Sequence, residues 1–119
     1  MRRRHWHLRI ADMLDAVETA VHLAEDLERD AFFYNRVLVD AVIKNITVLG
    51  EAAARMPADV TERWPDVPWR EMRDMRNFIV HEYFGLNRDV LWGTVRDDLP
   101  ALIPVLRRML ERENPGPLR

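Results

Sequence analysis

The sequence predicts an all-α protein, an up-down bundle of four main helices, and three observations support this fold class. Apolar residues recur at spacings of three and four through long segments, which is the pattern of amphipathic helices. Three prolines of a connector at 56–68, Gly85 and the candidate capping residues Asp30 and Asn87 fall between these segments. The 119 residues are 48% hydrophobic and 32% charged, which suffices for one core. We therefore expect a single domain over residues 1–119, frayed at about 1–4 and 114–119.

The first half of the chain predicts two long helices, at residues 6–28 and 31–55, with Asp30 as the N-cap of the second. The second helix is apolar over a wide surface, which suggests a central position or contact with a partner. Its polar residues form a narrow stripe, made of Arg36, Asp40, Lys44, Thr47, Glu51 and Arg55. This stripe is either a salt-bridged strip facing water or the rim of a cleft, with Glu51 near enough to hold Arg76.

The middle of the chain predicts a connector at residues 56–68 that contains a short helical turn near 58–64. Trp64 and Trp69 are expected to hold this connector against the bundle, because both side chains are large and apolar. A third helix is expected to start near residue 68.

The last helix is predicted over residues 88–112, after Gly85 ends the third helix, with Asn87 as the N-cap. Two prolines fall inside it and each removes a backbone hydrogen bond, so we expect a kink at Pro100 and Pro104. Asp98 lies in this segment and Glu113 directly after it. Neither acidic residue has a partner side chain at a spacing that the sequence alone would reveal.

Composition narrows the class of protein. The absence of cysteine excludes disulfides and thiolate zinc sites. No apolar run reaches the roughly 20 residues of a membrane span, and the N-terminus has no apolar signal region, so a cytoplasmic location is expected. The formal net charge of −2 means that contact with nucleic acid would use a local patch rather than a basic surface as a whole.

The third helix carries the residues best suited to chemistry. At about 100° per residue, Arg76 falls on the apolar arc, whereas Asn77 and His81 fall on the opposite arc. A buried guanidinium is costly unless it meets a carboxylate, a phosphate or a polar cleft. Arg73 and Glu51 are candidates for supporting such a cleft.

Arg76 and His81 are five residues apart, which is roughly 140° around an ideal helix. One straight helix cannot aim both side chains at one atom. They converge either if the helix bends near His81, or if a second copy of the chain brings its own Arg and His across a two-fold axis.

These residue types suit cleavage of RNA. A histidine imidazole ordinarily titrates near neutral pH, so this residue type at position 81, His81, can act as base or acid without a metal or cofactor. Arg76 can clamp a phosphodiester and stabilise charge on its oxygens, with Asn77 as an orienting group. The expected reaction is attack of a ribose 2′-hydroxyl on its neighbouring phosphate, which DNA cannot undergo.

The segment Arg76-Asn-Phe-Ile-Val-His81-Glu-Tyr83 resembles the motif of the HepT-like toxins in the HEPN superfamily: Arg, four residues, His, one residue, Tyr. Further matches are Gly50-Glu51-Ala52, the approach from Pro65 to Trp69, and the segment from Val90 through Pro100. The resemblance implies a HEPN-like bundle that forms a homodimer, with both motif copies lining one cleft.

The resemblance also implies a metal-independent endoribonuclease that acts as the toxin of a toxin–antitoxin pair. Its cognate antitoxin would be a minimal nucleotidyltransferase of the MntA type, which transfers AMP from ATP onto the motif tyrosine, here Tyr83. A phosphate on Tyr83, close to Arg76 and His81 in the sequence, would compete with the substrate phosphate.

A function of a different class stays open on the sequence alone. The apolar surface of residues 32–49 would also suit a non-catalytic helical partner, or a nucleotide-binding subunit, of a nucleotidyltransferase.

Overall fold

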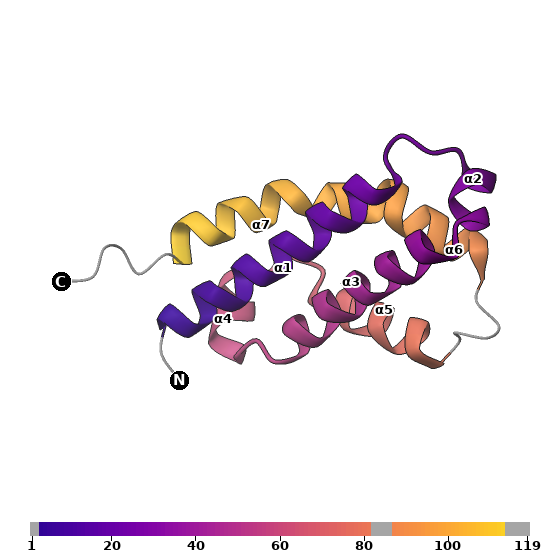
Figure 1. Cartoon of the computed structure of the whole chain (residues 1–119). Coiled ribbons are helices and arrows are strands. Elements are labelled where there is room, and N and C mark those ends of the chain that lie inside the picture. The colour runs from indigo at the N-terminus through magenta and orange to yellow at the C-terminus, as the bar shows by residue number, and fades with distance from the viewer. Residues whose placement is uncertain (1–2, 82–86, 114–119) are drawn as a thin grey trace.

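The computed structural model describes residues 3–81 and 87–113, with side chains described for residues 6–75 and 87–113. Within these ranges the secondary structure is entirely helical, so the predicted all-α fold class is confirmed (Figure 1). None of the described helices is both long and apolar enough to cross a membrane. The predicted frayed end at 114–119 and the predicted helix end at Gly85 lie outside the described residues.

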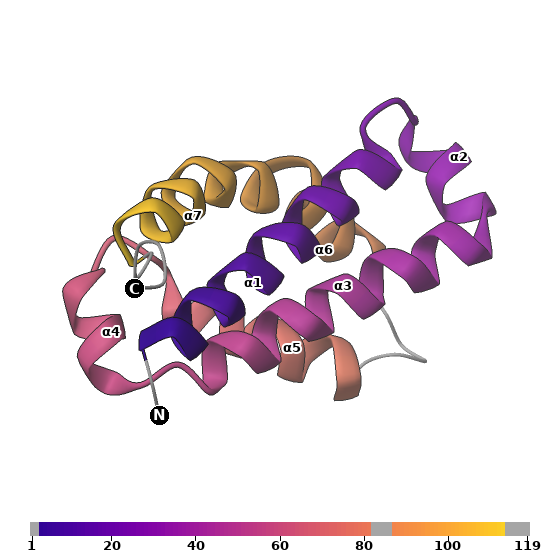
Figure 2. The same ribbon diagram turned by 60° about the vertical axis from the view of Figure 1, so that its left-hand side comes forward.

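Four main helices form the bundle: α1 (Arg3–Ala24), α3 (Arg36–Ala54), α5 (Trp69–His81) and α7 (Leu99–Glu113). Shorter elements join them, namely α2 (Arg29–Tyr34), α4 (Ala58–Arg63), α6 (Arg88–Gly93) and the π-helical turn η1 (Thr94–Asp98). Helix α1 packs against both α3 and α7, and α5 packs against α3 (Figures 1 and 2).

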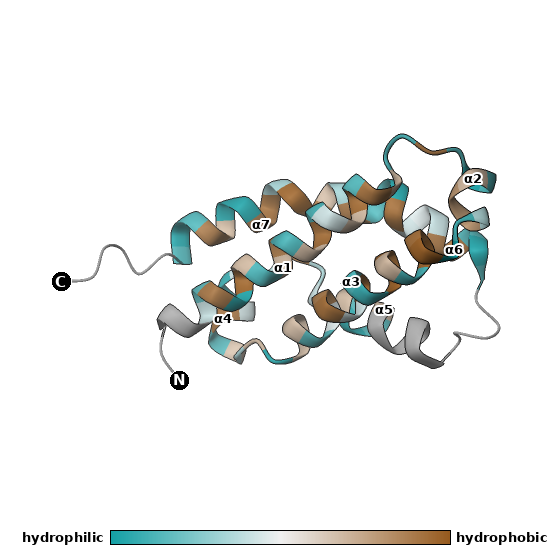
Figure 3. Ribbon diagram, viewed as in Figure 1, coloured by the Kyte–Doolittle hydropathy of each residue, from teal (hydrophilic) through white to brown (hydrophobic). Residues whose placement is uncertain are grey.

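The core is a single cluster of buried apolar side chains contributed by every main helix. The largest fully buried members include Ile10, Met13, Ile46, Leu49, Met72, Leu106 and Met109. Apolar and polar positions alternate around the turns of α1, α3 and α7, as the periodicity predicted (Figure 3). Each such side chain contributes about 1.5–3 kcal/mol when it leaves water, so the cluster dominates the stability of the bundle.

The predicted helix at 31–55 is wrong in one respect, because the chain breaks into α2 and α3 at Asn35. Asn35 has φ −94° and ψ 94°, and its side-chain oxygen accepts a hydrogen bond from the Leu38 amide at 3.2 Å. This side chain caps α3 and competes with continuation of the preceding helix. Asp30 is therefore not the N-cap but lies in the first turn of α2, whose N-cap is Glu28.

The first helix also ends earlier than predicted, at Ala24 rather than residue 28. The Arg96 guanidinium donates to the carbonyls of Ala24 and Glu25 at 3.1 and 3.0 Å. A cation from a distant segment thus satisfies the last carbonyls of α1, and no local sequence signal reveals it.

The predicted connector and its short helix are confirmed, since α4 occupies residues 58–63. Trp64 and Trp69 are both buried, as expected, and the Trp69 indole N–H donates to the Trp64 carbonyl at 2.9 Å. The Trp64 indole N–H donates in turn to a carboxylate oxygen of Glu113, at 3.0 Å. The connector is therefore fixed to the end of α7.

At Pro100 the predicted distortion takes the form of the π-helical turn η1, which ends two residues before it, whereas α7 continues as an α-helix through Pro104. The Leu99 amide donates to the Thr94 carbonyl, a bond that spans five residues instead of four. Pro100 has no amide N–H, so the ordinary α-helical bond to residue 96 cannot form. The predicted N-cap is confirmed, because the Asn87 side chain accepts from the Val90 amide at 3.2 Å.

Candidate functional site

Helix α5 presents a buried face and an exposed face in the turns whose side chains are described. Trp69 and Met72 are buried against the core, whereas Arg70, Arg73 and Asp74 are exposed. Arg70 and Asp74 approach each other along the exposed face, with nitrogen and oxygen 3.9 Å apart.

The backbone register carries these faces into the last turns of α5, which the structure describes as helical to His81. Positions seven residues apart on a helix differ by only about 20° around its axis. Arg76 follows buried Trp69 by seven residues, whereas His81 follows exposed Asp74 by seven. The side chains of Arg76 and His81 lie outside those that the structure describes, so their placement on opposite faces of the helix stays a prediction from the sequence.

Asn77 is likewise predicted by the sequence to share the arc of His81, four residues later. The side chains of Arg76, Asn77 and His81 lie outside the described residues, as does the whole of Tyr83. Whether these side chains meet therefore stays a prediction.

The two supporting residues lie on neighbouring helices. Glu51 is exposed on α3 and Arg73 is exposed on α5, and these helices pack together. The polar stripe of α3 is exposed at most of its positions, and Arg36 pairs with Asp40 at 3.3 Å within it. This arrangement fits the water-facing interpretation, while contact between Glu51 and Arg76 concerns a side chain that is not described.

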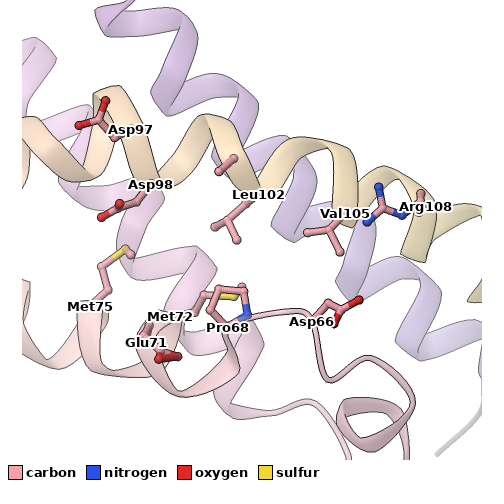
Figure 4. A pocket seen from close by; sticks show the side chains of 11 residues that line it. Asp66, Pro68, Glu71, Met72, Met75, Asp97, Asp98, Leu102, Val105 and Arg108 are labelled. Carbon is pink, nitrogen blue, oxygen red and sulfur yellow. The ribbon is translucent and has the colours of Figure 1, made fainter.

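A cleft of about 510 Å³ lies between α5 and the η1–α7 segment (Figure 4). Its floor is apolar and includes Met72, Leu102 and Val105. Asp97 and Asp98 of η1 line it, together with further acidic residues of the connector and α5. The sequence analysis missed this group, because its members come from segments 26 to 32 residues apart and meet only after folding.

Glu113 is the second acidic residue whose partner the sequence did not reveal. Its buried carboxylate accepts two hydrogen bonds from Arg63, at 3.1 and 2.6 Å, in addition to the one from Trp64. The hydrogen bonds that Arg63 donates to the Glu113 carboxylate raise the pKa of Arg63 above its ordinary value. Among the described residues, no group of three His, Asp or Glu side chains is placed to hold a metal ion.

Comparison with known proteins identifies the family. The model of the family described as ribonuclease HepT-like matches residues 13–109, which is most of the chain. The chain belongs to the HepT-like ribonuclease family. The predicted resemblance is thereby confirmed, and the matched span contains α5 with Arg76, Asn77 and His81.

Three relatives agree with this membership in the HepT-like family. A probable ribonuclease HepT of Thermococcus cleftensis is 36% identical over 106 residues, covering 86% of this chain and 92% of the relative. A candidate RNase of Methanocaldococcus jannaschii is 33% identical over 91 residues, which cover 76% of this chain and 84% of the relative.

The third relative, from the same archaeon, is named as a gamma-glutamylcyclotransferase and candidate RNase. It is 31% identical over 99 residues, or 83% of this chain, but this match covers only 45% of the longer relative. No solved structure matches the chain.

Proposed function

We propose that this HepT-like chain is a metal-independent endoribonuclease and the toxin of a toxin–antitoxin pair. The observation that carries the proposal is the sequence motif from Arg76 to Tyr83, which lies inside the segment that matches the ribonuclease family. The names of the three relatives, which refer to RNase activity, support the same reaction class.

The proposed reaction needs a base, an acid and a clamp for the phosphate. A neutral His81 imidazole removes the proton from a ribose 2′-hydroxyl, whose oxygen then attacks the adjacent phosphorus. The bond from phosphorus to the 5′-oxygen breaks, and a protonated imidazole returns a proton to that oxygen. The products are a 2′,3′-cyclic phosphate and a free 5′-hydroxyl, while Arg76 stabilises the charge on the phosphoryl oxygens.

A homodimer would bring the two groups together. Arg76 and His81 are five residues apart, roughly 140° around an ideal helix, so one straight copy of this helix would not direct both toward one phosphate. In a two-fold dimer, His81 on the exposed face of one copy can approach Arg76 of the other. Each cleavage site then depends on both chains, and Asn77 on the same face as His81 would orient the imidazole.

Cleavage should require the ribose 2′-hydroxyl and no divalent metal. We expect the purified chain to cut an RNA oligonucleotide and to leave the same RNA intact where a 2′-deoxyribose replaces the attacking ribose. Added EDTA should leave the rate unchanged. Measurement is by gel electrophoresis of end-labelled RNA, with 2′,3′-cyclic phosphate ends identified by mass spectrometry. Cleavage of DNA of the same sequence, or loss of activity with EDTA, would contradict the proposal.

The proposed antitoxin is a minimal nucleotidyltransferase that modifies Tyr83. The Tyr83 phenol oxygen attacks the α-phosphorus of ATP, pyrophosphate leaves, and the phenolic proton passes to solvent. The attached AMP places a negative phosphate near Arg76 and His81, where it excludes the RNA phosphate.

Incubation with an active nucleotidyltransferase of this kind and ATP should add the mass of AMP to Tyr83. The chain has two tyrosines, so Tyr34→Phe is a matched control: Tyr34 is 93% exposed on α2, far from α5 in the sequence. We expect AMP addition to persist in Tyr34→Phe and to disappear in Tyr83→Phe, as measured by intact-mass and peptide mass spectrometry. Modification that survives in Tyr83→Phe would refute the assignment.

A further inference from the structure

The seam between α5 and α7 is the open side of the bundle. Among the described residues, the main helices pack closely in the pairs α1–α3, α1–α7 and α3–α5. The remaining neighbours, α5 and α7, instead face each other across the cleft of about 510 Å³ (Figure 4). This volume falls within the roughly 300–1,000 Å³ range of ligand pockets, so the cleft has room for more than one side chain.

The floor of the cleft is apolar and adaptable. Met72, Leu102 and Val105 form its deeper wall and are buried, while Met75 is half-buried at one end. Methionine side chains are unbranched and polarizable, so they adjust to the shape of an incoming apolar group. An occupant with aliphatic or aromatic side chains would remove this surface from water.

The rim of the cleft is strongly acidic. Glu71, Asp97 and Asp98 gather around one end, close to Met75, and Asp66 lies at the other end with Arg108 (Figure 4). Among the described residues that line the cleft, four carboxylates thus face a single guanidinium. The field at this site favours cations and repels a phosphate backbone, so RNA is an unsuitable occupant.

We propose that this cleft is the docking site for an amphipathic, basic segment of another protein. Apolar side chains of that segment would enter between α5 and α7, and its Lys or Arg residues would pair with Glu71, Asp97 and Asp98. Helix-in-groove binding of this kind uses apolar anchors for affinity and rim charges for orientation and association rate.

Docking would act on the helix that carries the proposed catalytic residues. Glu71, Met72 and Met75 belong to α5, one to three turns before His81. A bound segment would therefore change how α5 presents its last turns. This regulatory consequence rests on the proposed function, whereas the binding itself does not.

The test uses the full chain and a synthetic 14-residue helical peptide of leucine and lysine, labelled with fluorescein. We expect saturable binding by fluorescence anisotropy, with perturbed methyl signals of Met72 and Met75 in NMR spectra. The triple variant Glu71→Gln/Asp97→Asn/Asp98→Asn should weaken binding about tenfold, as expected for the loss of three rim ion pairs.

A matched triple variant controls for net charge. Asp12→Asn/Asp15→Asn/Asp26→Asn removes the same three charges from exposed positions in and just after α1, away from the cleft. We expect it to bind the peptide within about twofold of wild type, since distant exposed charges are screened. All six substituted side chains are exposed, so both variants should fold, which circular dichroism checks.

Four outcomes would overturn the docking proposal. One is the absence of saturable binding, and another is equal weakening in both triple variants. A third is equal binding of a lysine–serine peptide, which would show that only charge attracts the occupant. The fourth is an oligomer of the free chain that the cleft variant disrupts, which would make a second copy the occupant. A chain that binds the peptide but cleaves no RNA would contradict the proposed function alone.

Discussion

His81→Ala lowers the rate of RNA cleavage by a factor of about 10²–10⁴, the range that a general acid–base contributes. Arg76→Ala lowers the rate of RNA cleavage by a factor of about 10²–10³, because the charge that develops on the phosphoryl oxygens is no longer stabilised by the guanidinium. Two matched variants should keep full activity: His22→Ala on α1, whose imidazole lies 2.9 Å from exposed Glu25, and Arg70→Ala on the exposed face of α5. Single-turnover cleavage of labelled RNA measures all four rates.

Mixing the two inactive variants tests the shared site directly. If each site takes Arg76 from one chain and His81 from the other, a heterodimer of Arg76→Ala and His81→Ala holds one intact site of two. Refolding an equal mixture should then restore about a quarter of wild-type activity, since half of the dimers are mixed. If both groups act within one chain, every site lacks one of them and the mixture stays inactive. A mixture without recovery would refute the two-chain site, even if each variant alone is inactive.

Glu113→Ala should cost about 2–3 kcal/mol of unfolding free energy, the second large effect that we expect. Glu113 is only 3% exposed and holds both Arg63 and the Trp64 indole, so its removal leaves a buried N–H donor without its acceptor. The value is below the full cost of breaking a buried ion pair because the Arg63 side chain is 43% exposed and returns to water. For a domain of this size the unfolding temperature should fall by about 8–12 °C.

The control for this prediction is a surface ion pair. Glu18→Ala breaks a pair with Arg107 whose two side chains are 39% and 61% exposed. We expect a loss of at most about 1 kcal/mol, since such pairs exchange their partner for water. Glu113→Gln should fall between the two, because its amide oxygen still accepts from Trp64. Urea unfolding followed by circular dichroism gives all three values, and equal losses for Glu113→Ala and Glu18→Ala would disprove the buried-pair account.

The sequence predicted the elements of the fold whose signals are local. Periodic apolar positions located the four main helices, and the proline-rich connector located α4. The Asn87 side chain accepts a hydrogen bond from the amide of Val90, only three residues later, so the sequence alone could predict this N-cap. Asn35 carries the same capping signal, but it sits inside a strongly apolar run whose periodicity continues through it, and the break was missed.

In the candidate site, too, some features follow from the local sequence and others depend on the tertiary structure. The opposite faces predicted for Arg76 and His81 follow from helix periodicity alone, and this prediction concerns side chains outside the described residues. The cleft could not be predicted, because Glu71 and Asp97 acquire a common surface only when α5 and η1 are placed opposite each other. The convergence of Arg76 and His81 depends on a second chain in the proposed dimer, and a periodic pattern carries no information about such an arrangement.

The sequence by itself determined the helical class, the family and the motif, because amphipathic periodicity and short spacings are properties of neighbouring residues. Only the tertiary structure decided that Glu113 ties the connector to α7 and that α5 and α7 leave an acidic cleft between them. Those contacts join residues 26 to 50 positions apart, and their pairing is fixed by how the helices pack rather than by local preference.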